Sequence, residues 1–477
     1  MIALFLTDVH ENFGALFDIV HSNDPDVVLL GGDILSNPDL SLLRDIFLLL
    51  NDFSSEDILF VPGNWEPIEI LLWDMFGRSL NIHASRRTIG EYTFCGIGGS
   101  APRIFFFPLE LNIEDIEYYA GRLQDIGEVS VFISHMIPYD CVVLKNLIHS
   151  LSPKVALCGH IHEKIFIRRD NGTIVANPGA VYDGRYSIVN IDEGEVLLRN
   201  TGDYLDGLNM REDSLWKTLS DDPSSLRLLP ILDTIYMGYP KYRSLLKRTG
   251  ITHLLRAIPI DGLYGLALYR TALISRDYSM PLLDEDTLLR IIGRNAMYDR
   301  WVIRIIRDTW SGSPPRQILE PIIENLRRWS FDEICFSLLD ILRMPTVMSL
   351  HENTLAEIFD MLHSKIPERL SLHHVFLLLA NAMLSNQKFL GIEDIIDSTH
   401  NIIEDASLDS LGILIEGLSR YTSRELLEKL AHHLKPVINE KLEDTKTTEV
   451  EFFRRRISML MPRDSIFVIT LADTLLD

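Results

Sequence analysis

Five short apolar runs within residues 1–160 each end in a turn that carries aspartate, asparagine or histidine, and this feature constrains the fold most. The runs are rich in valine, isoleucine and leucine over lengths typical of strands. Residues 12–22 and 40–53, which lie between them, have apolar residues at helical spacing. This alternation predicts α/β layering. The runs are IALFLT, DVVLLGG, DILFVPG, VSVFISH and KVALCGH.

The turns after these runs supply side chains that suit a metal centre. In open α/β sheets, ligands bind at the carboxyl ends of strands, so residues that follow different strands can meet at one edge. Aspartate, asparagine and histidine offer the oxygen and imidazole donors that suit Mn²⁺, Fe and Zn²⁺, and a neighbouring glycine permits a sharp turn. The motifs are Asp8-Val9-His10, Gly31-Gly32-Asp33, Gly63-Asn64, Ser134-His135 and Gly159-His160-Ile161-His162.

These motifs, in this order, resemble the DxH, GD, GN, His and GHxH pattern of the calcineurin-like metallophosphoesterase superfamily. The stretches DVHENFGAL and NPGAVYDGRYSIV are similar to its small prokaryotic phosphodiesterase branch. The resemblance covers residues 1 to about 198. It implies a four-layer α/β sandwich, in which helices flank two mixed β-sheets, and a metal-dependent phosphoric ester hydrolase, either a phosphodiesterase or a phosphatase.

The resemblance also implies a dinuclear centre of two divalent metal ions. Manganese is the first expectation, with iron, zinc, cobalt and nickel as alternatives. In the family pattern, Asp8, His10 and His162 hold one ion, Asn64, His135 and His160 hold the other, and Asp33 bridges both. A hydroxide bridging two metals about 3.5–4 Å apart would attack phosphorus in line, while the cations neutralise developing charge. The same resemblance makes Asp33, Asn64 and His135 the expected catalytic residues.

The residue after Asn64 departs from the family pattern. Many members have a histidine there that helps to protonate the leaving oxygen, whereas this chain has Trp65, whose indole has no usable proton for acid catalysis. An acid step is typically worth about 10²–10⁴ in rate, so we expect good leaving groups, or diesters protonated from elsewhere. Trp65 would either bind substrate through its apolar face or pack under Trp73 and Phe76. Glu66 is expected to orient its neighbours.

An all-helical part is predicted beyond the point near residue 200 where the strand pattern stops. A polar stretch, TGDYLDGLNMREDS, indicates a linker, and amphipathic segments follow it. Their lengths favour a loose HEAT-like helical repeat, with an irregular bundle as the alternative, because no repeat consensus fixes a period. We therefore predict a metallophosphoesterase domain over 1–200, a linker over 201–225 and a helical domain over 226–477.

Charge and composition restrict the partners. Residues 1–200 hold 13 Lys and Arg against 28 Asp and Glu, so this part repels polyanions at long range. Residues 241–307 are basic, with 12 Lys and Arg against 6 Asp and Glu. We interpret this region as docking on the acidic domain or as a solvated helix face with internal ion pairs, ahead of nucleic-acid binding. The chain shows no signal-peptide pattern, membrane span or disulfide spacing, which predicts a cytoplasmic protein.

Three functions remain open from the sequence. The first is a phosphoesterase whose helical part shapes the substrate cleft or recruits a protein partner. The second is a catalytically weak scaffold, similar to the retromer subunit of the superfamily, which the missing histidine supports and the full ligand set opposes. The third is a nuclease, which the acidic charge opposes.

Overall fold

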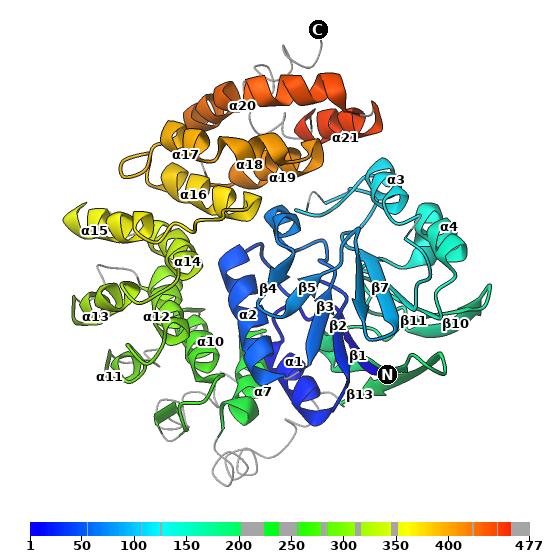
Figure 1. Cartoon of the computed structure of the whole chain (residues 1–477). Helices are drawn as coiled ribbons and strands as arrows, with labels where there is room; N and C mark the ends of the chain where they lie inside the picture. Colours follow the sequence, from blue (N-terminus) through cyan, green and yellow to red (C-terminus); the bar gives the residue numbers. More distant parts are fainter. Residues whose placement is uncertain are drawn as a thin grey trace. The chain divides into compact units, whose positions relative to one another are not determined.

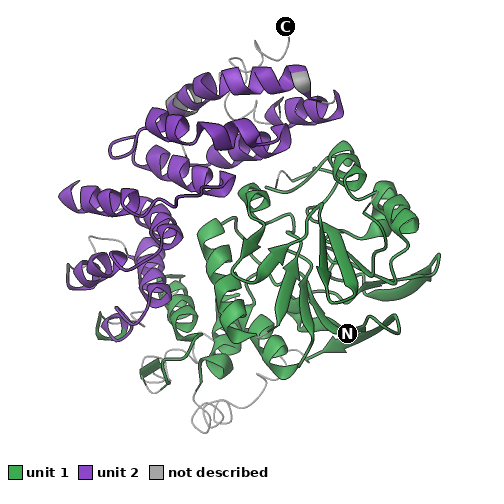
Figure 2. Ribbon diagram, in the orientation of Figure 1, with its two compact units in different colours: residues 1–287 green, residues 288–477 purple. Residues whose placement is uncertain are grey.

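The computed structural model describes the chain except residues 55, 106, 125, 202–223, 238–254, 257, 278–282, 284, 311–315, 345–351, 422–423, 446 and 459–477. The chain divides into two compact units, Met1–Thr287 and Leu288–Asp477, which are coloured separately in Figure 2. Among the described residues, no helix is long and apolar enough to cross a membrane. The four cysteines, Cys95, Cys141, Cys158 and Cys335, are buried and are not joined in disulfides.

Two mixed β-sheets form the centre of the first unit. The seven-stranded sheet has the order β13-β12-β1-β2-β3-β5-β4, and the six-stranded sheet has the order β10-β11-β9-β8-β7-β6. The first comprises β1 (Ile2–Leu6), β2 (Val27–Leu30), β3 (Asp57–Phe60), β4 (Met75–Phe76), β5 (Ser79–Asn81), β12 (Arg185–Asn190) and β13 (Glu195–Asn200). The second comprises β6 (Arg86–Ile89), β7 (Tyr92–Ile97), β8 (Val131–Ser134), β9 (Val155–Leu157), β10 (Phe166–Asp170) and β11 (Thr173–Asn177).

Strands β1, β2 and β3 run parallel to one another, as do β7, β8 and β9. The five apolar runs of the sequence therefore form the parallel strands β1, β2, β3, β8 and β9, and their carboxyl ends point the same way within each sheet. The strand pairs β6–β7, β10–β11 and β12–β13 are antiparallel hairpins. Asn171 and Gly172 lie at the turn of the second, both with positive φ.

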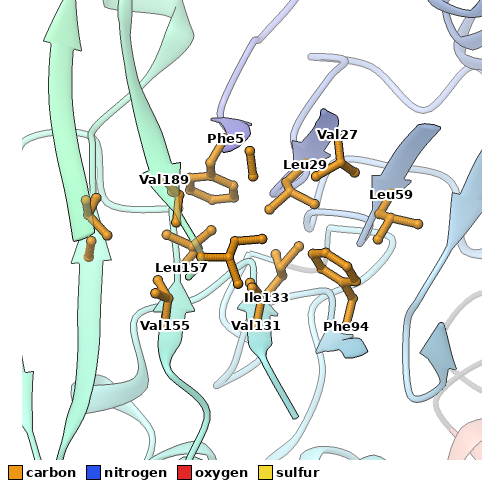
Figure 3. Packing of buried hydrophobic residues seen from close by; sticks show 14 of the residues in the cluster. Phe5, Val27, Leu29, Leu59, Phe94, Val131, Ile133, Val155, Leu157 and Val189 are labelled. Carbon is orange, nitrogen blue, oxygen red and sulfur yellow. The ribbon is translucent and has the colours of Figure 1, made fainter. Parts of the chain in front are cut away.

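The two sheets pack face to face through one apolar core. Phe5, Leu29 and Leu59 enter it from the first sheet, and Phe94 and Ile133 enter it from the second (Figure 3). All five side chains are fully buried. Because both faces of these central strands are covered, their sequences are continuously apolar rather than alternating. This core fixes the two sets of strand ends relative to each other.

Helices cover the outer faces of the sheets (Figure 1). They are α1 (Phe13–Ser22), α2 (Leu40–Phe53), α3 (Ile113–Gly121) and α4 (Val142–Leu151), with short 3-10 turns at Ile68–Leu72, Pro138–Asp140 and Val181–Asp183. Two further helices of this unit, α7 (Ser225–Tyr236) and α10 (Tyr264–Asp277), pack on α1 and on α7. The side chains of Asn12 and Asp39 accept hydrogen bonds from the first turns of α1 and α2, which explains where both helices start. The predicted sandwich of two mixed sheets flanked by helices is confirmed.

The compact units do not coincide with the domain boundaries that we predicted from the sequence. We placed the helical domain at 226–477, whereas α7 and α10 lie in the first unit, because α7 packs on α1 and α10 packs on α7. The linker predicted over 201–225 lies almost entirely outside the described residues. The division at 1–200, 201–225 and 226–477 stays a prediction, and two helices of its last part are structurally joined to the first.

The second unit is helical throughout its described residues, as predicted. Helices α12, α14, α16, α19 and α21 contact one another in succession, and α13, α15, α17 and α20 pack beside them. The HEAT-like helical repeat and the irregular bundle both stay predictions for this unit. The helices are α11 (Glu285–Leu289), which crosses the boundary between the units, then α12 (Ala296–Thr309), α13 (Arg316–Leu326), α14 (Phe331–Leu342), α15 (Glu352–His363), α16 (Leu372–Leu384), α17 (Ile392–Ser398), α18 (His400–Asp405), α19 (Leu408–Leu418), α20 (Arg424–Asp444) and α21 (Thr447–Ser458).

Candidate metal centre

The seven side chains that the sequence marked as metal ligands meet where five strands end. Each follows one of the parallel strands β1, β2, β3, β8 and β9 within a few residues. Their imidazole and carboxylate atoms form two groups, each with three possible ligand atoms within 4.8 Å of one another. The groups are Asp8, His10 and His162, and Asp33, His135 and His160.

The first group joins the turn after β1 to the turn after β9. His162 Nε2 lies 3.4 Å from Asp8 Oδ1, and His10 Nε2 lies 3.1 Å from His162 Nε2. Asp8 is completely buried, whereas His10 and His162 are partly exposed. The side of this group that solvent reaches is therefore lined by the two imidazoles.

The second group joins the turns after β2, β8 and β9. His135 Nε2 lies 3.3 Å from Asp33 Oδ2 and 3.0 Å from Asn64 Oδ1, which brings the asparagine to this group as well. The Oδ2 atom of Asp33 also lies 3.7 Å from His10 Nε2 in the first group. Asp33 thus stands between the two groups, where a bridging ligand would have to be.

Backbone conformations at this edge are unusual and place the ligands closely. Asp8, His10, Asp33 and His160 all have φ between 45° and 69°, which is the left-handed region that non-glycine residues seldom adopt. Gly63 makes room for Asp33, because a Cβ there would lie 2.1 Å from Asp33 Oδ1. Strain of this kind is held only where surrounding contacts fix the chain, and it is concentrated at functional sites.

Glu66 is one such contact. Its buried carboxylate accepts hydrogen bonds from the backbone N–H groups of Asp33 at 2.9 Å, Ile34 at 2.6 Å, Leu35 at 3.2 Å and Gly63 at 2.5 Å. Burial raises the pKa of Glu66 to about 7, with a further contribution from the charge of Asp33, while the backbone bonds oppose the rise. These bonds agree with the expectation that Glu66 orients its neighbours.

The imidazoles of the site differ in pKa, because each has a different balance of burial and nearby charge. Burial opposes ionisation of Asp8, but its hydrogen bond with His162 and the nearby imidazoles bring its pKa down to about 2. Burial likewise disfavours a charged His135, but Asp33 and Asp8 outweigh it and raise the pKa of His135 to about 10. The pKa of His160 falls to about 4 through burial and the charge of His135. The site thus favours positive charge beside its carboxylates but does not tolerate it on every imidazole.

The donor set fits divalent metal ions. His135 Nδ1 lies 2.8 Å from the carbonyl oxygen of Gly31 and can donate to it. Such a hydrogen bond fixes the tautomer and orientation of a metal-binding histidine. Nε2 faces Asp33 and Asn64 and is the nitrogen that would bind a metal after losing its proton. In the other group, two imidazole nitrogens face each other at 3.1 Å, an arrangement that a cation between them would satisfy. Mixed imidazole, carboxylate and amide donors suit transition metals.

Trp65 lies at the edge of this site. Its ring packs on Phe107 with centroids 4.0 Å apart and planes tilted by 36°, and it meets His10 edge-on at 6.4 Å. Trp73 and Phe76, the packing partners that we considered from the sequence, stack on each other. The contact with Phe107 was missed, because the residue lies in a loop without a motif.

In the described part of the basic region, arginines of α12 make internal contacts. Arg300 and Arg304 on α12 are buried, and Arg304 and Arg307 both pair with Asp340. These internal ion pairs match one part of our interpretation, but their burial shows that the helix face is not solvated. The other named basic residues, Lys241, Arg243, Lys247 and Arg248, lie outside the described residues.

A third group with possible metal-binding geometry lies in the second unit and comprises Asp332, His373 and His374. His374 Nδ1 accepts a hydrogen bond from the backbone N–H of Ser371, which caps the start of α16. Asp332 lies in the first turn of α14. Both helix starts favour negative rather than positive charge, so capping explains these residues without a metal.

Known proteins were compared with this chain by family, by sequence and by structure. The family model described as calcineurin-like phosphoesterase matches residues 1–164. The uncharacterized protein MJ1162 of Methanocaldococcus jannaschii is 30% identical over 191 residues, which cover 35% of this chain and 85% of that protein. The solved structure of TT1561 from Thermus thermophilus has a TM-score of 0.35 and 16% identity, over 42% of this chain and 98% of that one. The structure of TM1076 from Thermotoga maritima has a TM-score of 0.25 and 19% identity over the same shares.

Proposed function

Because the chain belongs to the calcineurin-like phosphoesterase family, we propose that it hydrolyses a phosphate ester with two divalent metal ions bound at the strand-end site. The observation that carries the proposal is the pair of adjoining His and Asp groups with Asp33 between them. More specifically, we propose that the enzyme is a phosphodiesterase or a phosphatase and that it prefers Mn²⁺.

The residues divide into two ligand sets in this proposal. Asp8, His10 and His162 hold one ion, Asn64, His135 and His160 hold the other, and Asp33 contacts both. When bound, the ions supply a water-derived nucleophile at neutral pH and neutralise charge on the phosphoryl oxygens. The protein fixes the ligands in advance: Gly31 orients His135, and Glu66 holds the turn that bears Asp33. Such preorganisation spares reorganisation during the reaction.

Trp65 restricts the substrates of this site. It cannot protonate a leaving oxygen, so esters whose leaving groups depart unassisted are the expected substrates. With Phe107 it forms an aromatic wall next to His10, and such a wall favours a flat apolar leaving group. We propose that Trp65 binds this part of the substrate and that aryl phosphate esters are hydrolysed faster than alkyl ones.

The test is hydrolysis of nitrophenyl phosphate and bis(nitrophenyl) phosphate by the full chain after reconstitution with Mn²⁺. Activity should appear with the metal and should disappear in Asp33→Ala. Asp340→Asn, in the second unit, is the matched control for loss of a buried carboxylate and should keep the activity. An inert wild-type protein with every common divalent metal would refute the enzyme proposal.

A catalytically weak scaffold is the second candidate, since Trp65 occupies the place of the usual acid. In that case the helical unit would bind a protein partner, while the metal groups would be vestiges. Elemental analysis after reconstitution separates the two: about two transition metal ions per chain support the enzyme, and none supports the scaffold. The nuclease alternative loses support because Arg300, Arg304 and Arg307 serve internal contacts. A cytoplasmic location stays a prediction.

A further inference from the structure

A buried arginine joins the helical extension of the first unit to the turn that bears Asp8 and His10. Arg270, on α10, is fully buried, and its guanidinium contacts two acidic residues. Nε lies 2.6 Å from Asp233 Oδ1 on α7, and Nη1 donates to Glu11 Oε2 at 3.2 Å. Nη2 donates to the main-chain oxygen of Glu11 at 2.6 Å. One side chain thus holds both the carboxylate and the backbone of the residue next to His10.

Two further contacts tie α7 to the same turn. Asp233 Oδ2 accepts a hydrogen bond from the backbone N–H of Gly14 at 2.6 Å, in the first turn of α1. The backbones of α1 and α7 are so close there that a Cβ on Gly14 would lie 2.3 Å from Pro230 Cα. The ion pair between Arg270 and Asp233 therefore connects to the backbone on both sides of Asn12.

The turn needs such support. His10 and Glu11 have φ of 45° and 64°, and non-glycine residues keep this conformation only when surrounding contacts enforce it. Their N–H groups bond to the carbonyl oxygens of Asp33 and Ile34, at 2.9 and 3.0 Å. Arg270 holds Glu11 from the opposite direction through its carbonyl oxygen. The position of the His10 imidazole follows from both sets of contacts.

We propose that Arg270 is a positioning residue for the metal group of Asp8, His10 and His162, so that part of the predicted helical domain completes the catalytic centre. This inference rests on the proposed metal site. It differs from a general stabilising role, because Arg270 contacts the turn of one group only. The turns that carry Asn64, His135 and His160 follow other strands, so the second group should depend on Arg270 much less.

The test uses the metal-free full chain and titrates it with Mn²⁺ by calorimetry. Arg270→Lys keeps the buried positive charge but lacks the planar fork that reaches Asp233 and both Glu11 acceptors at once. The expected result is two binding events, as in the wild type, with the affinity of one reduced about 10- to 100-fold, which is typical for loss of a residue that orients a ligand. His10→Ala should weaken the same event, which assigns it.

Arg304→Lys is the matched control, because Arg304 is equally buried and pairs with Asp340 in the second unit. It should leave both Mn²⁺ affinities unchanged even if it lowers Tm. Two unchanged affinities in Arg270→Lys would overturn the inference, and so would an equal loss at both sites in both arginine variants. If Arg270→Lys does not fold, Glu11→Gln, which keeps the carbonyl acceptor, should reduce the same event less. A wild-type chain that binds no Mn²⁺ would refute the proposed function instead.

Discussion

Replacing Glu66 with glutamine tests how the turn that bears Asp33 is held. In the structure, Oε1 accepts from the N–H groups of Ile34 and Leu35, and Oε2 accepts from those of Asp33 and Gly63. Glutamine keeps nearly the same shape but retains one acceptor oxygen. Its amide nitrogen would face two N–H donors, which cannot bond to it.

The expected loss follows from those two donors. A buried N–H that loses its acceptor costs about 1–3 kcal/mol, so Glu66→Gln should lower the free energy of unfolding by about 2–6 kcal/mol. For a domain of about 150–250 residues, each kcal/mol corresponds to roughly 2–4 °C, so Tm should fall on the order of 10 °C. Affinity for Mn²⁺ should also fall, by about 10- to 100-fold, because the Asp33 turn loses its support.

Thermal unfolding of the metal-free protein and Mn²⁺ calorimetry measure the two effects separately. Glu110→Gln is the control: its Oε2 alone accepts from Ile104, Phe105 and Phe107, so the single oxygen of glutamine can replace it. It should change Tm little and leave Mn²⁺ affinity unchanged. If Glu66→Gln matches this control in both measurements, the four backbone bonds do not hold the turn and the reasoning is refuted.

Three further predictions follow from the site and the second unit. Trp65→His should speed hydrolysis of alkyl phosphate esters by up to about 10²-fold with little gain on nitrophenyl esters, because only poor leaving groups need an acid; equal gains on both would contradict this. Removing the metals with a chelator should lower the free energy of unfolding by about 2.7 kcal/mol for each ion lost, relative to protein in free metal at 100 times Kd, measured by thermal unfolding; an unchanged Tm would contradict binding to the folded state. Burial raises the pKa of Asp299 from 3.8 to about 6, so its ionisation costs stability as pH rises from about 4 to 6. Asp299→Asn keeps only one of the two acceptor oxygens, which bond to Gly293 N–H and Asn325 Nδ2, and this loss is the same at every pH. The stability of Asp299→Asn relative to the wild type should therefore rise by up to about 3 kcal/mol between pH 4 and pH 6, measured by denaturant unfolding at both pH values, and a difference independent of pH would contradict the cause.

The site could be predicted from the sequence because each motif is local. Asp8 and His10 lie two residues apart after one strand, and every further motif follows another parallel strand, so strand order alone brings them together. The supporting residues behave differently. Glu66 is two residues from Asn64 and could be expected to orient its surroundings, whereas Arg270 lies 259 positions from Glu11 and carries no pattern. A buried arginine in an amphipathic helix looks like any solvated one until the partner helix is known.

The sequence also does not show which helices pack together, and this explains why the boundary predicted near residue 200 differs from the end of the first compact unit. Strand periodicity ends there, and this is a true change of secondary structure, but periodicity does not report which helices pack on which core. Gly14 and Pro230 are an example. Their backbones lie close together only because α1 and α7 pack on each other, and periodicity does not reveal that contact. The sequence therefore predicted where helices replace strands but not where the first compact unit ends.

The net charge of residues 1–200 and the local charge at the proposed metal site both restrict the substrate of the proposed hydrolase. Residues 1–200 carry 28 acidic against 13 basic residues, and this field repels an extended polyanion over distances near the Debye length of about 8 Å. At contact distance the balance reverses, since two divalent ions bring four positive charges against the two negative charges of Asp8 and Asp33. A nucleic acid would need a row of exposed cations to cross the outer field, and Arg300, Arg304 and Arg307 are engaged within their own unit. A single phosphate group on a small molecule needs no such row, and Trp65 and Phe107 form an apolar surface beside His10 of the proposed metal site. A small ester with an aromatic leaving group therefore suits this centre better than a nucleic acid does.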